Sequence, residues 1–129
     1  MAASTDIRRR WRDGTSYGYP VLAGVRIFGG TMIGVTAAGA AVPAAHASAV
    51  ALVGFAKESI DNTTGATGDQ HIEARKGVTQ IPLAGAAYAD IGKTVYASAD
   101  DTFTLTAGAL LAAGSIDAID AEGVWLKTR

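Results

Sequence analysis

The sequence predicts an all-β fold, either a barrel or a sandwich, on three grounds. Short apolar runs are separated by turn residues, at about the 8–12-residue spacing typical of such folds. Several runs alternate apolar and polar side chains, which is the pattern of a strand with one buried face. No segment keeps the 3.6-residue apolar period of an amphipathic helix.

The length and composition of the chain favour a single domain. Its 129 residues include 16 glycines, few aromatic residues and no cysteine. This length suffices for a buried core without disulfides. The lack of cysteine excludes a thiolate nucleophile and a cysteine metal site. Because small residues dominate the core, we expect oligomerisation to contribute stability.

Residues 1–20 predict an extended N-terminal arm, and residues 21–129 predict a single β domain. The arm is polar and rich in arginine, with glycine at 14 and 18 and proline at 20. A residue that precedes proline favours extended geometry. We therefore place the domain boundary after residue 20.

Alternation locates the strands of the domain. In one segment, Ile72 and Ala74 share a face, and His71, Glu73 and Arg75 share the opposite face. The same reasoning, applied along the chain, gives a set of short strands. The expected strands lie near residues 25–28, 31–36, 50–57, 70–75, 78–83, 94–97, 102–106, 112–119 and 123–127.

Two of these segments also predict what their faces contact. Phe103 and Leu105 should point inward, since threonines occupy the alternate positions and suit a solvated face. Near the end of the chain, Trp125 opposes Val124 and Leu126. One of these two faces should therefore cover something other than the main core.

Turn-forming residues mark the connections between the strands. Glycine, asparagine, aspartate and threonine favour turns through their backbone freedom or their own side-chain hydrogen bonds. Turns are expected at residues 37–39, 100–101 and 121–123, a long polar loop at 61–69, and a single helical turn at 87–91.

Charge is distributed unevenly between the arm and the domain. Residues 1–26 contain five arginines and two aspartates, a net charge of +3, whereas residues 27–129 contain six basic and ten acidic groups, a net charge of −4. Charge blocks at a terminus are typical of tails that bind another molecule. The basic residues of the arm form a cluster that comprises Arg8, Arg9, Arg10 and Arg12 around Trp11.

An export signal is one interpretation of this cluster. An apolar run at 21–42 follows it, and then a small-residue segment, Ala-His-Ala-Ser-Ala, at 45–49. Arg26 interrupts the apolar run, and glycines and threonines divide it into alternating pieces. These interruptions argue against a signal and exclude a membrane-spanning helix, so we expect no membrane partner.

Binding to a protein partner explains the cluster better than binding to nucleic acid. The acidic domain would repel phosphates, and four arginines are too few for strong non-specific binding. Arginine pairs bidentately with carboxylates, and Trp11, Tyr17 and Tyr19 belong to residue types that anchor interfaces. An extended arm can also add a strand to a partner's sheet. A solvated, disordered tail is the alternative that stays open.

Candidate catalytic and metal-binding residues are few. His71, Glu73 and Arg75 line one strand face, but no nucleophile or second carboxylate accompanies them in the sequence. The acidic loop at 61–69 lacks the ligand spacing of a calcium-binding loop. The glycines form neither a dinucleotide nor a phosphate-binding motif. We therefore expect a protein without enzymatic activity, cofactor or metal.

The order and spacing of several pieces resemble those of the small decoration, or cement, proteins of tailed-phage heads. Together these pieces cover most of residues 12–127. They are Arg-Asp-Gly at 12–14 and the segments 21–30, 35–44, 53–56 with 61–62, 75–78, 89–96 and 123–126.

The resemblance implies a small barrel or a β-clip, β-tulip-like domain. It further implies a homotrimer that sits on the outer surface of the capsid after assembly in the host cytoplasm, and that clamps neighbouring major capsid subunits. The partner-binding residues would be those of the arm, Arg8, Arg9, Arg10, Trp11, Arg12, Tyr17 and Tyr19. The alternatives are another virion component, such as a head-fibre base or tail adaptor, and an exported cell-surface β domain.

Overall fold

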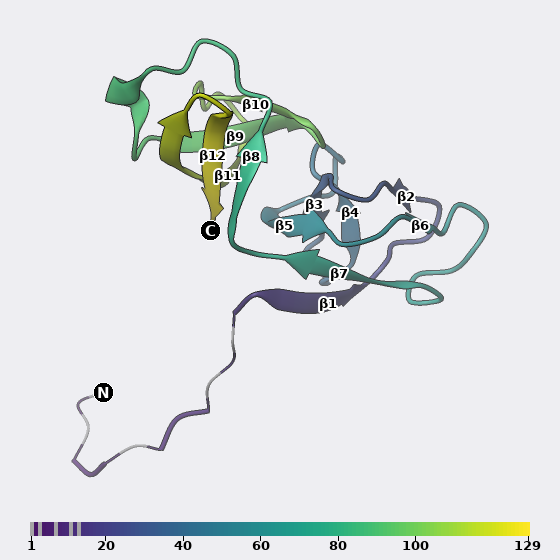
Figure 1. Ribbon diagram of the computed structural model, residues 1–129. Helices are drawn as coiled ribbons and strands as arrows, with labels where there is room; N and C mark the ends of the chain where they lie inside the picture. Colours follow the sequence, from purple (N-terminus) through teal and green to yellow (C-terminus); the bar gives the residue numbers. More distant parts are fainter. Residues whose placement is uncertain (1, 3, 7, 11, 13) are drawn as a thin grey trace.

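The computed structural model describes residues 2, 4–6, 8–10, 12 and 14–129. Over this part of the chain it is built from twelve strands and one short 3-10 helix, so the all-β prediction is confirmed. Two five-stranded antiparallel sheets and one two-stranded ribbon make up the fold (Figure 1).

The first sheet has the strand order β1-β7-β5-β3-β4. Its edges approach each other, because Val21, just after β1, forms a parallel bridge to Ala41 in β4. The Leu22 N–H donates to the Ala41 carbonyl at 3.1 Å across this bridge. The strands are β1 (Ser16–Pro20), β7 (His71–Arg75), β5 (Ala51–Ala56), β3 (Met32–Val35) and β4 (Ala41–Pro43).

The second sheet has the order β10-β9-β11-β12-β8. Its centre is the long hairpin of β11 and β12, whose turn falls at residues 121–122. The chain crosses directly from the first sheet to the second between β7 and β8. The strands are β10 (Thr102–Thr104), β9 (Thr94–Ala99), β11 (Leu111–Asp120), β12 (Gly123–Thr128) and β8 (Val78–Ile81).

Two apolar clusters account for the packing. The larger joins the two sheets and includes Met32, Leu52, Val95, Ile116 and Leu126. The smaller lies on the other face of the first sheet, beneath the ribbon of β2 (Arg26–Ile27) and β6 (Ile60–Asp61). Strand β3, in which Met32 belongs to the larger cluster and Ile33 to the smaller, is therefore buried on both faces. Strand β7 buries one face only, as its alternation predicts.

Every predicted strand overlaps an observed one, but three observed strands were not predicted. These are β1, β4 and β6, which contain two to five residues and include Pro20 and Pro43. Their sequences show no alternation long enough to detect. They become strands because segments distant in the chain supply hydrogen-bonding partners, as β7 does for β1.

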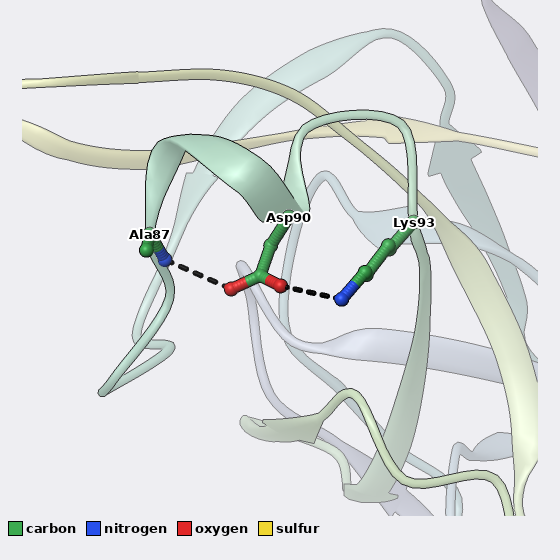
Figure 2. A network of polar contacts seen from close by, with 3 residues as sticks. All are labelled: Ala87, Asp90 and Lys93. Carbon is green, nitrogen blue, oxygen red and sulfur yellow. Dashed lines mark hydrogen bonds and ion pairs between the residues drawn. The ribbon is translucent and has the colours of Figure 1, made fainter.

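The predicted turns and the helical turn are also present. The turn at 37–39 joins β3 to β4, and the polar loop at 61–69 joins β6 to β7. The helical turn is the 3-10 helix η1 (Tyr88–Asp90). Figure 2 shows how Asp90 holds it: one carboxylate oxygen accepts from the Ala87 N–H at 2.9 Å, and the other accepts from Lys93 Nζ at 2.8 Å.

The two predictions about strand faces agree with the structure. Phe103 is buried and packs against Phe55, with ring centroids 6.3 Å apart. Val124 and Leu126 are buried in the larger cluster, whereas Trp125 lies on the opposite face. Its indole N–H donates to Asp120 Oδ2 at 3.1 Å, so this face covers the end of the β11–β12 hairpin.

Candidate functional site

The arginines of the arm are all exposed. Arg8, Arg9 and Arg10 lie on a segment that extends away from both sheets, whereas the exposed guanidinium of Arg12 lies near Tyr17 of β1 (Figure 1). Trp11, which the sequence placed in the same cluster, lies outside the described residues. The arm therefore presents its guanidinium groups to solvent in the single chain.

Strand β1 connects this arm to the body. The sequence assigned residues 16–20 to the arm, but the structure pairs them with β7, from Ser16 opposite Arg75 to Pro20 opposite His71. The physical reason is that β7 offers a complete row of main-chain partners. The segment that projects from the body therefore ends near residue 15, five residues earlier than the sequence placed the boundary.

The two tyrosines of the predicted site lie on β1, on the face that points inward. Tyr17 is opposite Ala74 and Tyr19 is opposite Ile72, and both tyrosines are half-buried. Tyr19 packs against the smaller apolar cluster. Part of the area of Tyr19 is thus used inside the molecule, which leaves Tyr17 nearer the arm as the more available ring.

Tyr17 lies between two cations. The guanidinium carbon of Arg12 is 5.5 Å from its ring centroid, and Lys76 Nζ is 5.2 Å from the same centroid. Both distances lie within the range of cation–π attraction. The tyrosine ring therefore lies close to both the last arginine of the arm and a lysine of the body. Arg12 and Tyr17 also line an open hollow formed by residues 12 and 14–19.

The outer edge of β1 carries unpaired main-chain groups. Lys76 N–H donates to the Thr15 carbonyl at 2.8 Å and Val21 N–H donates to the Gln70 carbonyl at 2.8 Å, which fixes the phase of the ladder. By the antiparallel alternation, the main-chain groups of Ser16 and Gly18 point away from β7. Pro20 has no N–H to offer there.

Three cations of the body lie beside the arm, and the sequence did not predict them as part of this site. Lys57, after β5, pairs with Glu73 at 3.1 Å and donates to Ser16 Oγ at 3.4 Å. Arg75 and Lys76 follow on β7 and just beyond it. The signal that could have found them is the Arg-Lys pair at 75–76, but only strand pairing brings it next to β1.

The candidate catalytic face does not assemble into a reactive site. His71 and Glu73 are exposed on β7, and Glu73 is engaged by Lys57. Arg75 lines a cleft between the sheets that neither of the other two residues lines. Among the described residues, no group of three or more histidine, aspartate or glutamate side chains is placed to hold a metal ion.

The acidic turns use their carboxylates within the fold. Asp61 accepts from the Thr63 hydroxyl at 2.6 Å and from its N–H at 3.0 Å, and these hydrogen bonds lower the pKa of Asp61. Asp120 accepts from Trp125 Nε1 and from the Glu122 N–H, and these hydrogen bonds lower the pKa of Asp120. Both carboxylates stabilise turns.

Comparisons with known proteins give no match: neither a protein-family model, nor a curated protein, nor a solved structure matches this chain. In the part of the chain that the structure describes, no helix has the length and apolar character needed to cross a membrane. The arm, β1 and the adjoining cations therefore form the candidate functional site.

Proposed function

We propose that the chain is a structural virion protein, a decoration protein that binds the outer surface of a tailed-phage head and clamps neighbouring major capsid subunits. The observation that carries the proposal is the cationic arm that projects from β1, with Tyr17 held between Arg12 and Lys76. The arrangement suits an acidic protein surface, because guanidinium groups form bidentate pairs with carboxylates.

The arm supplies both charge and shape for such a contact. Its exposed arginines can order against a partner, and the outward main-chain groups of Ser16 and Gly18 can continue the pairing onto a partner strand. Ordering the arm costs conformational entropy, which the charge-assisted hydrogen bonds offset. The body then remains a rigid β domain above the contact.

A clamp of this kind resists the outward pressure of a packaged genome. Each copy buries surface across a seam between subunits, so that opening the seam exposes that surface. Many modest contacts act together through their effective concentration. A catalytic centre is not needed for this role, and the buried side chains of both sheets serve the stability of the domain.

The test is binding of the purified protein to undecorated heads assembled from the cognate major capsid protein. A variant without residues 1–14 keeps β1 and should sediment with heads much more weakly than the full chain. Replacement of Arg8, Arg9, Arg10 and Arg12 by glutamine should have a similar effect. Lys127→Gln, which removes an exposed cation on β12, is the matched control and should bind normally.

Electron microscopy with a specific antibody separates this role from the others. Label on the outside of the heads supports a decoration protein, and label on the tail or on fibre bases assigns a different virion role. Absence of the protein from purified virions, or equal head binding by the truncated and full chains, would contradict the proposal. Export with cleavage near Ala47 would remove β1, β3 and β4, which are three of the five strands of the first sheet, and β2 of the ribbon.

A further inference from the structure

A cleft lies where the chain crosses from the first sheet to the second. Its volume is about 460 Å³, and its walls come from β8, from the end of β5 and from the residues that join β7 to β8. In Figure 1, β8 lies at the side of its sheet that faces β5 and β7. The cleft and the hollow beside Tyr17 share no lining residue, although Lys76 lines the cleft and also lies 5.2 Å from the Tyr17 ring centroid.

One wall of the cleft is a strand edge. Strand β8 pairs with β12 on one side and with no other strand of the described chain. The Thr128 N–H donates to the Gly77 carbonyl at 3.0 Å, which sets the phase of this ladder. By alternation, the N–H and C=O groups of Val78 and Gln80 point away from β12, toward the side on which the cleft lies.

Side chains also keep this edge apolar and ordered. Val78 is 50% exposed although it is aliphatic, and the exposed Pro82 also lines the cleft, whereas Ile81 is buried in the larger cluster. The Gln80 side-chain amide donates to the Glu122 carbonyl, which ties the strand to the β11–β12 turn. The edge therefore combines unpaired main-chain groups with an apolar strip, as strand-addition sites do.

Cations also line the cleft. They are Lys57, Arg75 and Lys76, and Asp101 is the carboxylate among the lining residues. Within the described chain, Lys57 pairs with Glu73, whereas Arg75 and Lys76 have no ion pair. The cleft thus has two cations available for an incoming carboxylate, beside a strand edge that lacks a neighbour.

We propose that this cleft binds an extended acidic segment of a partner protein, which adds as a strand to β8 and pairs its carboxylates with Arg75 and Lys76. The site goes beyond the contact made by the arm and needs none of the arm's residues. Alternation places side chains of an added strand on two faces. One face can carry carboxylates toward the cations while the other packs on Val78.

Charge decides which occupant fits. The chain's own arm is basic and would meet like charges at Arg75 and Lys76. A polyphosphate backbone satisfies the cations but offers no main-chain partners for Val78 and Gln80. An extended acidic peptide can pair both with the cations and with the main-chain groups of the β8 edge, so the observations favour it.

The probe is a capped peptide of alternating glutamate and valine, about six residues long, which is enough to span β8 and its flanks. Its affinity for the full chain is measured by calorimetry, and its position is mapped by amide chemical shifts. We expect the acidic peptide to change the amide chemical shifts of Val78 and Gln80. The matched lysine–valine peptide should bind much more weakly than the acidic peptide. An acidic peptide N-methylated at alternate residues should bind weakly, because it lacks the N–H groups that an added strand donates.

Variants separate the cleft from the arm. Arg75→Glu should weaken the binding of the acidic peptide by about tenfold or more, as expected for loss of a hydrogen bond to a charged group. Arg75 is chosen because Lys76 also lies near Tyr17, beside the arm. Arg9→Gln with Arg10→Gln should leave cleft binding unchanged while it reduces head binding. Loss of peptide binding by the cleft can thereby be distinguished from loss of head binding by the arm.

Val78→Pro removes an outward N–H from an edge strand, where proline is tolerated, and should also weaken the peptide. Val78→Ala keeps that N–H and should have a smaller effect. If Val78→Pro does not fold, the N-methylated peptide tests the same hydrogen bonds. Three results would overturn the proposal. The acidic peptide could shift only the amides of the arm, or it could bind no better than the basic peptide. The amides of the cleft could also shift with protein concentration in the absence of peptide, which would mean that the edge binds a second copy of the chain.

Discussion

At the scale of single residues, Asn62 is the polar side chain on which a whole loop depends. It is 2% exposed, and its amide nitrogen donates to the carbonyls of Val21, Leu22 and Ala66 at 3.0–3.2 Å. The loop at 61–69 is thereby fastened to the segment that follows β1. The sequence showed a polar loop there but gave no sign that one of its side chains is buried.

Asn62→Ala should lower the free energy of unfolding by about 2–3 kcal/mol, because it leaves buried carbonyls without a donor. Asn62→Asp should be at least as destabilising at neutral pH, since a carboxylate would face the same carbonyl oxygens. Urea unfolding measures both. Thr64→Ala, an exposed change in the same loop, is the control and should stay within about 0.5 kcal/mol of the parent. An Asn62→Ala protein as stable as this control would show that the hydrogen bonds of Asn62 do not stabilise the fold.

Three surface carboxylates give the protein a defined response to acid. Hydrogen bonds to Thr63, Lys93 and Trp125 lower the pKa of Asp61, Asp90 and Asp120, respectively, below the ordinary value of 3.8. Because the folded-state pKa is the lower one, each group contributes stability above about pH 3.8 that is lost as pH falls through the folded pKa.

We expect Asp90→Asn to be less stable than the parent at neutral pH and equally stable at the acid end of this range. The two curves of unfolding free energy against pH should therefore converge as pH falls below 3.8. Chemical denaturation at a series of pH values measures this. Glu58→Gln, an exposed change outside these networks, is the control. A difference that stayed constant down to acid pH would contradict the assigned hydrogen bonds.

At the scale of elements, β1 is where arm and body meet. It is an edge strand with five residues, and its pairing with β7 covers Ile72 and Ala74, which are 1% and 0% exposed. The described residues ahead of Arg12 lie away from the sheets (Figure 1). Stability and binding should consequently respond to different deletions.

Deletion of residues 1–14 should leave the thermal midpoint close to that of the full chain. Deletion of residues 1–20 should also remove Tyr19 and uncover Ile72, at a cost of at least about 2 kcal/mol from lost apolar burial. Thermal unfolding followed by circular dichroism measures both, and hydrogen exchange at the β7 amides locates the change. Equal midpoints for the two deletions would mean that β1 adds nothing to the fold.

At the scale of the whole molecule, the distribution of charge and the small core both favour association between copies of the chain. The arm is basic and the body acidic, so each copy presents opposite charges at different places. The two apolar clusters rely on many alanines and short aliphatic side chains. We therefore expect association with further copies to add stability.

We expect a homotrimer, as the resemblance to head decoration proteins implies. Light scattering after size exclusion should give about 39 kDa, three times the 13.1 kDa of one chain. High salt should weaken the trimer if arm arginines join the copies, since exposed ion pairs are screened. A mass of one chain at every concentration tested would refute the trimer.

The sequence by itself determined the class of fold and the places of its longer strands. Alternation at Ile72 and Ala74, and at Phe103, reports burial of one face, which is a local property of a strand. The turns at residues 37–39 and 121–123 were equally readable, because glycine and polar turn residues act over a few positions. The basic charge of the arm was also visible, because it is a sum over consecutive residues.

Only the tertiary structure decided where the arm ends and which cations stand beside it. Pro20 marked the boundary in the sequence, yet hydrogen bonds from β7 extend the body back to Ser16. Lys76 reaches Tyr17, and Arg75 reaches the cleft, only because the crossing from β7 to β8 places them there. Pairing between segments distant in the chain creates these contacts, and no pattern within either segment encodes them.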